Sequence, residues 1–273
     1  MNSVKLRAAV ELCRGTNSLA LSLLFLAVAR AAHAASWAEQ LAGSLAWLMT
    51  AASAYALNDR IDLAIDRINR PTRPLPSARL TTHEADLIIG ATALTALLSA
   101  LAWHPGILWI AGSLGLSGCY SIWLRHRSAI WSNVLASLLV AGVPLSAFNH
   151  LADAFWVLIP LGVFSLILAR ELQKDVVDAR GDKGTRPAAV MLSLDARNAD
   201  RLFRLLTVAA ILCLSAATKV LPLSDASKIV LLSAVVCPLA VSLLLPWPKQ
   251  LTAALDARLI KLATYSLVVA LLL

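Results

Sequence analysis

Long apolar segments alternate with short polar ones along the whole chain. A membrane-spanning helix needs about 20 mostly apolar residues, and the apolar segments meet that length. Several separators are short and turn-like, such as His104-Pro105-Gly106, and short connections favour antiparallel neighbouring helices. The pattern predicts an all-α polytopic membrane protein whose nine spanning helices occupy residues 16–35, 37–57, 83–102, 105–124, 129–148, 154–172, 201–219, 227–245 and 254–273.

Composition agrees with a membrane protein. The chain has 273 residues, of which 59% are hydrophobic and 15% charged, with a mean hydropathy of +0.74. Soluble domains carry about 25% charged residues. The four cysteines have no CxxC spacing, and three of them lie inside apolar runs. We therefore interpret them as small packing residues rather than as metal ligands or a disulfide.

The basic residues are distributed unevenly about the predicted spans. The net charge is +8, and all but three of the 24 Lys and Arg residues fall on the side of the N-terminus. The three exceptions are Arg30, Lys219 and Lys228. Positive charge accumulates on cytoplasmic loops, so we expect the N-terminus in the cytoplasm and the C-terminus on the opposite side. The net charge is a topology signal and does not indicate nucleic-acid binding.

Two acidic stretches interrupt the apolar pattern, at residues 58–66 and 170–182. Within each, the carboxylates are spaced so that they share one face of a helix. Carboxylates on one face repel each other unless a cation lies among them, and Mg²⁺ suits carboxylate, water and phosphate oxygens. A solvated charged face is the plainer alternative. We favour a metal–phosphate site because seven of the sixteen acidic residues lie here, and ionisable residues at a membrane are functional by default. These residues are Asp59, Asp62 and Asp66, then Glu171, Asp175, Asp178 and Asp182.

Both stretches are predicted at the cytoplasmic ends of their spans, where a charged cytoplasmic substrate could reach them. Four spans separate the two equivalent positions. This spacing is consistent with parallel repeated halves. We therefore predict a single domain over residues 1–273, with diverged halves at roughly 1–150 and 151–273 around a central cavity.

The residue pattern of these motifs resembles that of the UbiA superfamily of intramembrane prenyltransferases. Residues 58–66 match an NDxxDxxxD signature, residues 69–77 resemble its RPxRPLPSG tail with Ala78 in place of Gly, and residues 174–182 match a KDxxDxxxD form. Arg14-Gly15-Thr16-Asn17 resembles an RPxN motif with Gly15 in place of Pro, and Tyr120 with Arg125 resembles a Y…K element.

The resemblance implies transfer of an isoprenyl group from its diphosphate to an acceptor, with Mg²⁺ bridging the two clusters and the diphosphate. It implies metal ligands at Asp59, Asp62, Asp66, Asp175, Asp178 and Asp182. Diphosphate-binding residues would be Asn17, Asn58, Arg67, Arg73, Arg125 and Lys174. Chemically, diphosphate leaves once its developing charge is neutralised by metal and basic side chains.

Further roles concern the organic substrate. An aromatic face can stabilise the allylic cation, and among Trp47, Tyr55, Tyr120, Trp123 and Trp131 we favour Tyr120 as the catalytic aromatic. For Trp123 and Trp131 the favoured interpretation is an interfacial aromatic belt. The proton of a hydroxyl acceptor would pass to a carboxylate, with Asp66 and Asp182 as candidates, or to the released diphosphate. Residues 183–204 would cap the site.

The acceptor and the reaction class stay open at this point. The runs 66–71 and 169–175 are most similar to the digeranylgeranylglyceryl phosphate synthase branch, which suggests geranylgeranyl diphosphate as donor and a glycerol-phosphate ether as acceptor. Two alternatives remain. One is a membrane terpene cyclase of the same family, and the other is a transporter with a cation site at the cytoplasmic side.

Overall fold

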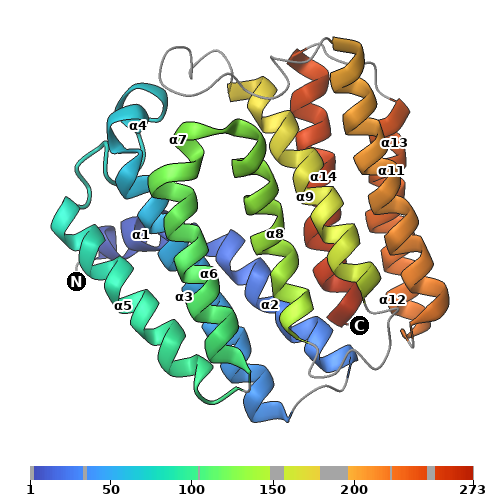
Figure 1. The fold of residues 1–273 in the computed structure, drawn as a ribbon, viewed down its shortest axis with the longest axis horizontal. Coiled ribbons are helices and arrows are strands. Elements are labelled where there is room, and N and C mark those ends of the chain that lie inside the picture. Colours follow the sequence, from blue (N-terminus) through green and yellow to red (C-terminus); the bar gives the residue numbers. More distant parts are fainter. Residues whose placement is uncertain are drawn as a thin grey trace. The chain divides into compact units, whose positions relative to one another are not determined.

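The structure is a computed structural model, and it describes residues 3–32, 36–103, 105–147, 157–178, 196–221, 223–244 and 250–272. These residues form helices and connecting turns, with no β-strand among them (Figure 1). The helices are α1 (Ser3–Leu12), α2 (Gly15–Ala31), α3 (Trp37–Ile61), α4 (Leu63–Asn69), α5 (Thr82–Ala100), α6 (Gly106–Cys119), α7 (Arg125–Arg127), α8 (Ala129–Ser146), α9 (Leu158–Asp178), α11 (Ala196–Val220), α12 (Asp225–Val230), α13 (Cys237–Leu244) and α14 (Gln250–Leu272), with π-helical turns η1 (Tyr120–Leu124) and η3 (Leu231–Val236).

Every predicted span overlaps a helix or a run of joined helices in the described part of the chain, so the all-α class is confirmed. Four helical stretches are long and apolar enough to cross a membrane: Gly106–Arg127, Ala129–Ser146, Asp200–Val220 and Asp225–Leu244. A fifth is added if α1 and α2, bent by 57°, form one broken span. Helices α3 and α9 carry charged residues of the acidic stretches in their last turns. The total of nine spans stays a prediction.

The chain divides into two compact units, each described by itself. Unit 1 comprises Met1–Leu26 and Ala35–Leu124, and unit 2 comprises Ala27–Ala34 and Arg125–Leu273. The prediction of one domain with halves meeting near residue 150 is not decided by this division.

Unit 1 is built on the packing of α3 against α5 (Figure 1). Both helices begin with a capping box: Ser36 and Glu39 start α3, and Thr81 and Glu84 start α5. In each box a hydroxyl accepts the backbone N–H of the Glu, and the Glu carboxylate accepts the N–H of the capping residue, so two unpaired donors are satisfied. The sequence therefore fixes where α5 begins, and with it the end of the loop that follows α4.

Small residues let α2 approach α3 closely. Ser22 Oγ donates to the Ser44 carbonyl at 2.8 Å, and Ser44 Oγ donates to the Ser22 carbonyl at 3.1 Å. Beside this pair, the ring of Phe25 packs edge-on against Trp103, with ring centroids 4.6 Å apart. A Cβ at Gly43 would lie 2.4 Å from Phe25 Cε1. Small residues and interhelical hydroxyl bonds are the usual means of helix association in membranes.

In unit 2, α9 packs between α8 and α11 and also contacts α14. Gly162 of α9 gives close contact with Leu214 of α11, because a Cβ at position 162 would lie 2.8 Å from its side chain. The run α12–η3–α13 is a helix interrupted by a π-helical turn, in which the Cys237 N–H bonds to the Leu232 carbonyl. Pro238 follows directly and lacks an N–H, a common cause of such interruptions.

Two glycines in different surroundings give a matched test of the α2–α3 packing. Gly43→Ala should lower stability by about 1–3 kcal/mol, because its methyl group would overlap the buried Phe25 ring. Gly90→Ala on α5 meets nothing within 4 Å and should raise stability by about 0.5–1 kcal/mol through helix propensity. Thermal unfolding in detergent micelles measures both. Equal effects of the two substitutions would contradict the packing described for Gly43.

Candidate active site

The first acidic stretch lies where α3 ends and α4 begins. Asp59 lies in the last turn of α3, Asp62 joins the two helices, and Asp66 lies in α4. All three are buried. The three carboxylates therefore lie in a region with little access to water, where unpaired charges are costly.

Arginine side chains compensate two of these carboxylates. Arg73 Nη1 donates to Asp59 Oδ1 at 3.1 Å and to Asp66 Oδ2 at 2.6 Å. Arg14 Nη2 donates to the same Asp59 oxygen at 2.8 Å. Asp62 instead accepts a bond from Asn58 Nδ2, at 3.3 Å. Burial raises the pKa of the Asp66 carboxyl above its ordinary value, and the neighbouring Arg73 acts against this rise.

Arg14 belongs to the site although it was not among the predicted site residues. It lies between α1 and α2 with a positive φ of 46°, and its guanidinium also stacks over Tyr55, 4.8 Å from the ring centroid. The predicted residue Asn17 lies in the first turn of α2, where its backbone N–H donates to the Arg14 carbonyl at 2.8 Å. The RPxN-like motif was a usable signal, but it directed attention to Asn17.

The loop from residue 70 to residue 81 holds Arg73 in position. The Arg73 carbonyl accepts Ser77 Oγ at 2.6 Å. Arg79 binds Glu11 of α1 through two nitrogens, at 2.7 and 2.9 Å, and the carbonyl of Thr72 at 2.6 Å. The loop is thus tied to α1 by charge, and its hydrogen bonds fix the backbone that carries Arg73.

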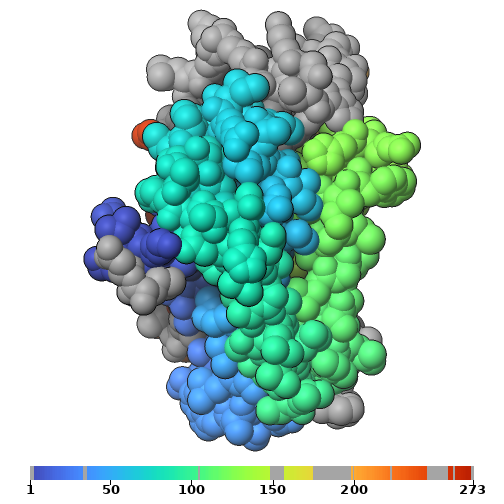
Figure 2. All heavy atoms as spheres, turned by 90° about the vertical axis from the view of Figure 1, so that its left-hand side faces the viewer, coloured from blue at the N-terminus to red at the C-terminus, as the bar shows by residue number. Residues whose placement is uncertain are grey.

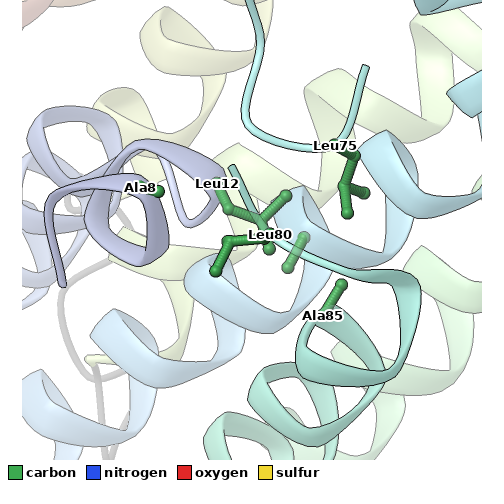
Figure 3. Close-up of a cluster of buried hydrophobic side chains, with 6 residues drawn as sticks. Ala8, Leu12, Leu75, Leu80 and Ala85 are labelled. Atoms are coloured by element: carbon green, nitrogen blue, oxygen red, sulfur yellow. The ribbon is translucent and has the colours of Figure 1, made fainter. Parts of the chain in front are cut away.

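The same loop is also anchored by a hydrophobic cluster. Figure 3 shows α1 contributing Ala8 and Leu12, and the loop contributing Leu75 and Leu80. Ala85 of α5 and Ala56 of α3 complete the buried set. Because α1 supplies both the packing and the Glu11 carboxylate, it positions the two arginines that reach the aspartates.

Ala78 occupies the position where the related motif has Gly, and the structure gives a reason for that Gly. Its φ is 56°, in the left-handed region that favours glycine over residues with a Cβ. The motif showed that Ala78 replaces a Gly. The positive φ in the structure shows that this replacement strains the backbone.

Two further predicted residues of unit 1, Arg67 and Tyr120, are not members of these ion pairs. Arg67 is exposed on α4. Tyr120 is partly buried and begins the π-helical turn η1, a form of helix often found at functional sites. Trp123 is 57% exposed, as an interfacial aromatic residue would be.

In unit 2, the predicted basic residues Lys174 and Arg125 interact with Glu171, a carboxylate that the predicted site left out, and Arg170 joins them. Lys174 Nζ lies 3.2 Å from Glu171 Oε2, and Arg170 Nη1 lies 3.3 Å from Glu171 Oε1. Arg125 is also close enough to interact electrostatically with Glu171. The acidic pattern had included Glu171, but the resemblance gave it no role.

Part of the second stretch is not covered. The helix α9 extends to Asp178, so Asp175 and Asp178 lie on its last turn, as predicted. Their side chains, together with Asp182 and residues 183–195 of the predicted cap, lie outside the described residues.

The first stretch offers a partial set of metal ligands. Among the described side chains, no three acidic, His or Cys residues form a cluster that could hold a metal by themselves. Asp59 and Asp66, however, direct one oxygen each to a single cationic nitrogen of Arg73. Mg²⁺ in phosphate sites takes one or two carboxylates and completes its shell with water and substrate oxygens. The residues present therefore fit a magnesium ion bound together with a phosphorylated substrate.

Comparison with known proteins then identifies the family. A model of the UbiA prenyltransferase family matches residues 19–265. The chain belongs to the UbiA prenyltransferase family. It is accordingly an integral membrane protein and a prenyltransferase, as the motifs predicted.

Relatives and solved structures extend this result. The chain is 35% identical over 208 residues to a digeranylgeranylglyceryl phosphate synthase of Ignicoccus hospitalis, covering 71% of this chain and 67% of that one. Alignments with the first curated relatives span about two thirds of their length or less.

Two solved structures have the same fold. A UbiA homologue from Aeropyrum pernix K1 has a TM-score of 0.76 at 14% identity, covering 93% of this chain and 98% of that one. A UbiA homologue from Archaeoglobus fulgidus bound to GPP and Mg²⁺ has a TM-score of 0.67 at 17% identity, covering 97% of this chain and 99% of that one.

The conformation of Ala78 gives a test of the loop. Ala78→Gly should stabilise the protein by up to about 1 kcal/mol, because Gly adopts a positive φ without steric cost. Ala64→Gly, in the exposed face of α4, should destabilise by about 1 kcal/mol through lost helix propensity. Thermal unfolding compares the two. If both substitutions destabilise equally, the left-handed conformation at Ala78 is wrong.

Proposed function

We propose that this prenyltransferase transfers an isoprenyl group from a prenyl diphosphate to the hydroxyl of a lipid acceptor in a Mg²⁺-dependent reaction. The favoured donor is geranylgeranyl diphosphate and the favoured acceptor a glycerol-phosphate ether, because the similar Ignicoccus protein is a digeranylgeranylglyceryl phosphate synthase. The observation that carries the proposal is the pair of buried carboxylates, Asp59 and Asp66, that share the Arg73 guanidinium.

The proposed metal ligands are those of the two acidic stretches: Asp59, Asp62, Asp66, Asp175, Asp178 and Asp182. A similar fold has been solved with GPP and Mg²⁺, which supports a metal at such a motif. When bound, Mg²⁺ would neutralise the charge that develops on the departing diphosphate. Arg73 Nη1 bonds to both Asp59 and Asp66, and this shared cation keeps the two buried carboxylates close together.

Basic and amide side chains would bind the diphosphate oxygens. We assign this role to Asn17, Asn58, Arg67, Arg73, Arg125 and Lys174, and we add Arg14 because it reaches Asp59 directly. A guanidinium binds phosphate oxygens with two parallel donors. Arg73 and Arg14 would thus exchange part of their bonding from carboxylate to phosphate when the substrate enters.

The transfer breaks the bond between the allylic carbon and the diphosphate oxygen and forms a bond from that carbon to the acceptor oxygen. The acceptor proton would pass to Asp66, to Asp182 or to the released diphosphate. Tyr120 would place its ring against the allylic cation, which is stabilised by an aromatic face. Exclusion of water from the buried aspartates would protect the cation from hydrolysis.

The expected orientation has the N-terminus and both acidic stretches at the cytoplasmic side and the C-terminus on the opposite side. A cytoplasmic diphosphate could then reach the site without crossing the bilayer. Labelling of single cysteines, introduced at exposed Ser77 and Ser224 in cysteine-free protein, with a membrane-impermeant maleimide in sealed right-side-out vesicles would test it. Only the Ser224 position should react before the vesicles are opened. Reaction at Ser77 in sealed vesicles would reverse the orientation.

The assay for the function supplies labelled prenyl diphosphates, candidate acceptors and Mg²⁺ or EDTA, with products identified by mass. Asp59→Asn and Asp62→Asn should each lower turnover about 10²- to 10³-fold, since each removes a charge that holds the metal. Asp86→Asn is the matched control, because Asp86 is exposed and forms a surface ion pair with Arg60, at 2.9 Å. Its turnover should stay within about twofold of the wild type.

Three results would overturn parts of the proposal. Full turnover in EDTA would exclude the metal. A cyclised hydrocarbon formed without acceptor would identify a terpene cyclase. Unchanged turnover in both Asp66→Asn and Asp182→Asn would remove the carboxylates as proton acceptors and leave the diphosphate in that role.

A further inference from the structure

The N-terminal helix α1 has an outer face that the site does not use. Its inner face is buried, through Ala8 and Leu12, against the loop that carries Arg73. On the other side, Leu6 and Val10 are each 55% exposed. They are four residues apart, one helical turn, so their side chains lie beside each other. A ten-residue helix thus presents a narrow apolar stripe away from the protein, and in Figure 2 its dark blue atoms protrude beside the teal atoms of α5.

The position of α1 relates this stripe to the membrane. Helix α2 begins three residues after α1 ends, and the two helices are bent by 57°. Val10 lies over the start of α2, since a Cβ at Gly15 would be 2.8 Å from Val10 Cγ1. If α2 crosses the bilayer as part of a broken span, α1 runs obliquely away from it. The stripe then begins at the depth where the span enters the membrane.

Charge on α1 is placed beside the stripe. Arg7 is exposed and follows Leu6 directly. Lys5 lies on the flank, where its Nζ binds Glu84 of α5 at 2.5 Å. Apolar side chains next to basic ones on a helix lying in the membrane plane are typical of helices that bind anionic lipid surfaces.

We propose that α1 docks in the interfacial layer of the membrane, with Leu6 and Val10 inserted among the lipids and Arg7 at anionic headgroups. A second protein chain is a poor fit for this face, because a stable interface buries roughly 800 Å² on each partner. Two side chains on a short helix offer far less than that. A lipid surface needs no such area, since the rest of the chain already anchors α1 to it.

Docking of α1 would couple the membrane surface to the site. The same helix carries Glu11, which binds Arg79, and leads directly into Arg14, which binds Asp59. A lipid surface that holds α1 therefore also restrains the arginines at the aspartates. This consequence concerns the geometry of unit 1 and does not depend on which acceptor the enzyme uses.

Spin labels give the direct test. Cysteines are introduced at Leu6, Val10 and Arg7 in full-length protein whose native cysteines are replaced by alanine, and the labelled protein is placed in nanodiscs with anionic lipid. Accessibility to oxygen relative to a water-soluble nickel chelate should be about threefold higher at positions 6 and 10 than at position 7. Equal ratios at all three positions would overturn the proposal. Labels at 6 and 10 that are shielded from both reagents would indicate protein contact and would also overturn it.

A second measurement keeps the native cysteines. Trypsin cleaves after Lys5 and Arg7, so docking should slow cleavage within α1. Leu6→Gln/Val10→Gln should be cleaved about threefold faster or more than wild type in anionic nanodiscs. Leu108→Gln, an exposed apolar residue on α6, is the control and should cleave at the wild-type rate. If the double variant and wild type are cleaved equally, the stripe does not bind lipid.

Discussion

The structure of unit 1 depends on how it compensates negative charge at the end of an apolar helix. Asp59 and Asp66 are buried, and each must have a cationic partner at all times, because an isolated charge in a low-dielectric region is strongly unfavourable. Arg73 supplies that partner for both and Arg14 supplies a second one for Asp59. Neither arginine belongs to the helix that carries Asp59. The chain around the motif is therefore arranged to bring them there.

Two connections do this, and each includes a residue with a positive φ. Arg14 turns the chain between α1 and α2, and Ala78 turns the loop between α4 and α5. Between them, α1 and the loop share the buried contacts of Leu12 and Leu80 and the ion pair of Arg79 with Glu11. Hydrophobic packing thus offsets the cost of the two turns and positions both guanidinium groups. The exposed Arg79–Glu11 ion pair orients the loop relative to α1 but contributes little to stability.

Much of the fold could be predicted because apolar length and helix caps are local properties of the sequence. Helix α5 begins within one residue of the predicted span, since Thr81 and Glu84 form a recognisable capping box. Helix α1 could not be predicted as a span, because it has ten residues and carries Lys5, Arg7 and Glu11. Its role follows from contacts with residues 68 to 79 positions away, and single-residue patterns do not encode such contacts.

The candidate site also has features that the sequence predicted and features that it could not predict. Spacing on a helix predicted that Asp59, Asp62 and Asp66 share a face, and all three are buried. It could not show that Arg73 joins two of them, nor that Arg14 reaches Asp59, because both depend on loop paths. In unit 2 the motif emphasised the aspartates, yet Lys174 pairs with Glu171. The motif consists of metal-binding aspartates. It therefore could not predict that Glu171 pairs with the basic residues Arg170 and Lys174.

The charge balance also constrains how a substrate can enter. A divalent ion that binds Asp59 and Asp66 must compete with a guanidinium already bonded to both, so metal alone would gain little by displacing it. A diphosphate changes this balance, because it gives the displaced arginine a new anionic partner with matching geometry. Metal and diphosphate would therefore bind best together, because the metal would take the carboxylates and the diphosphate would take the arginine that the metal displaces.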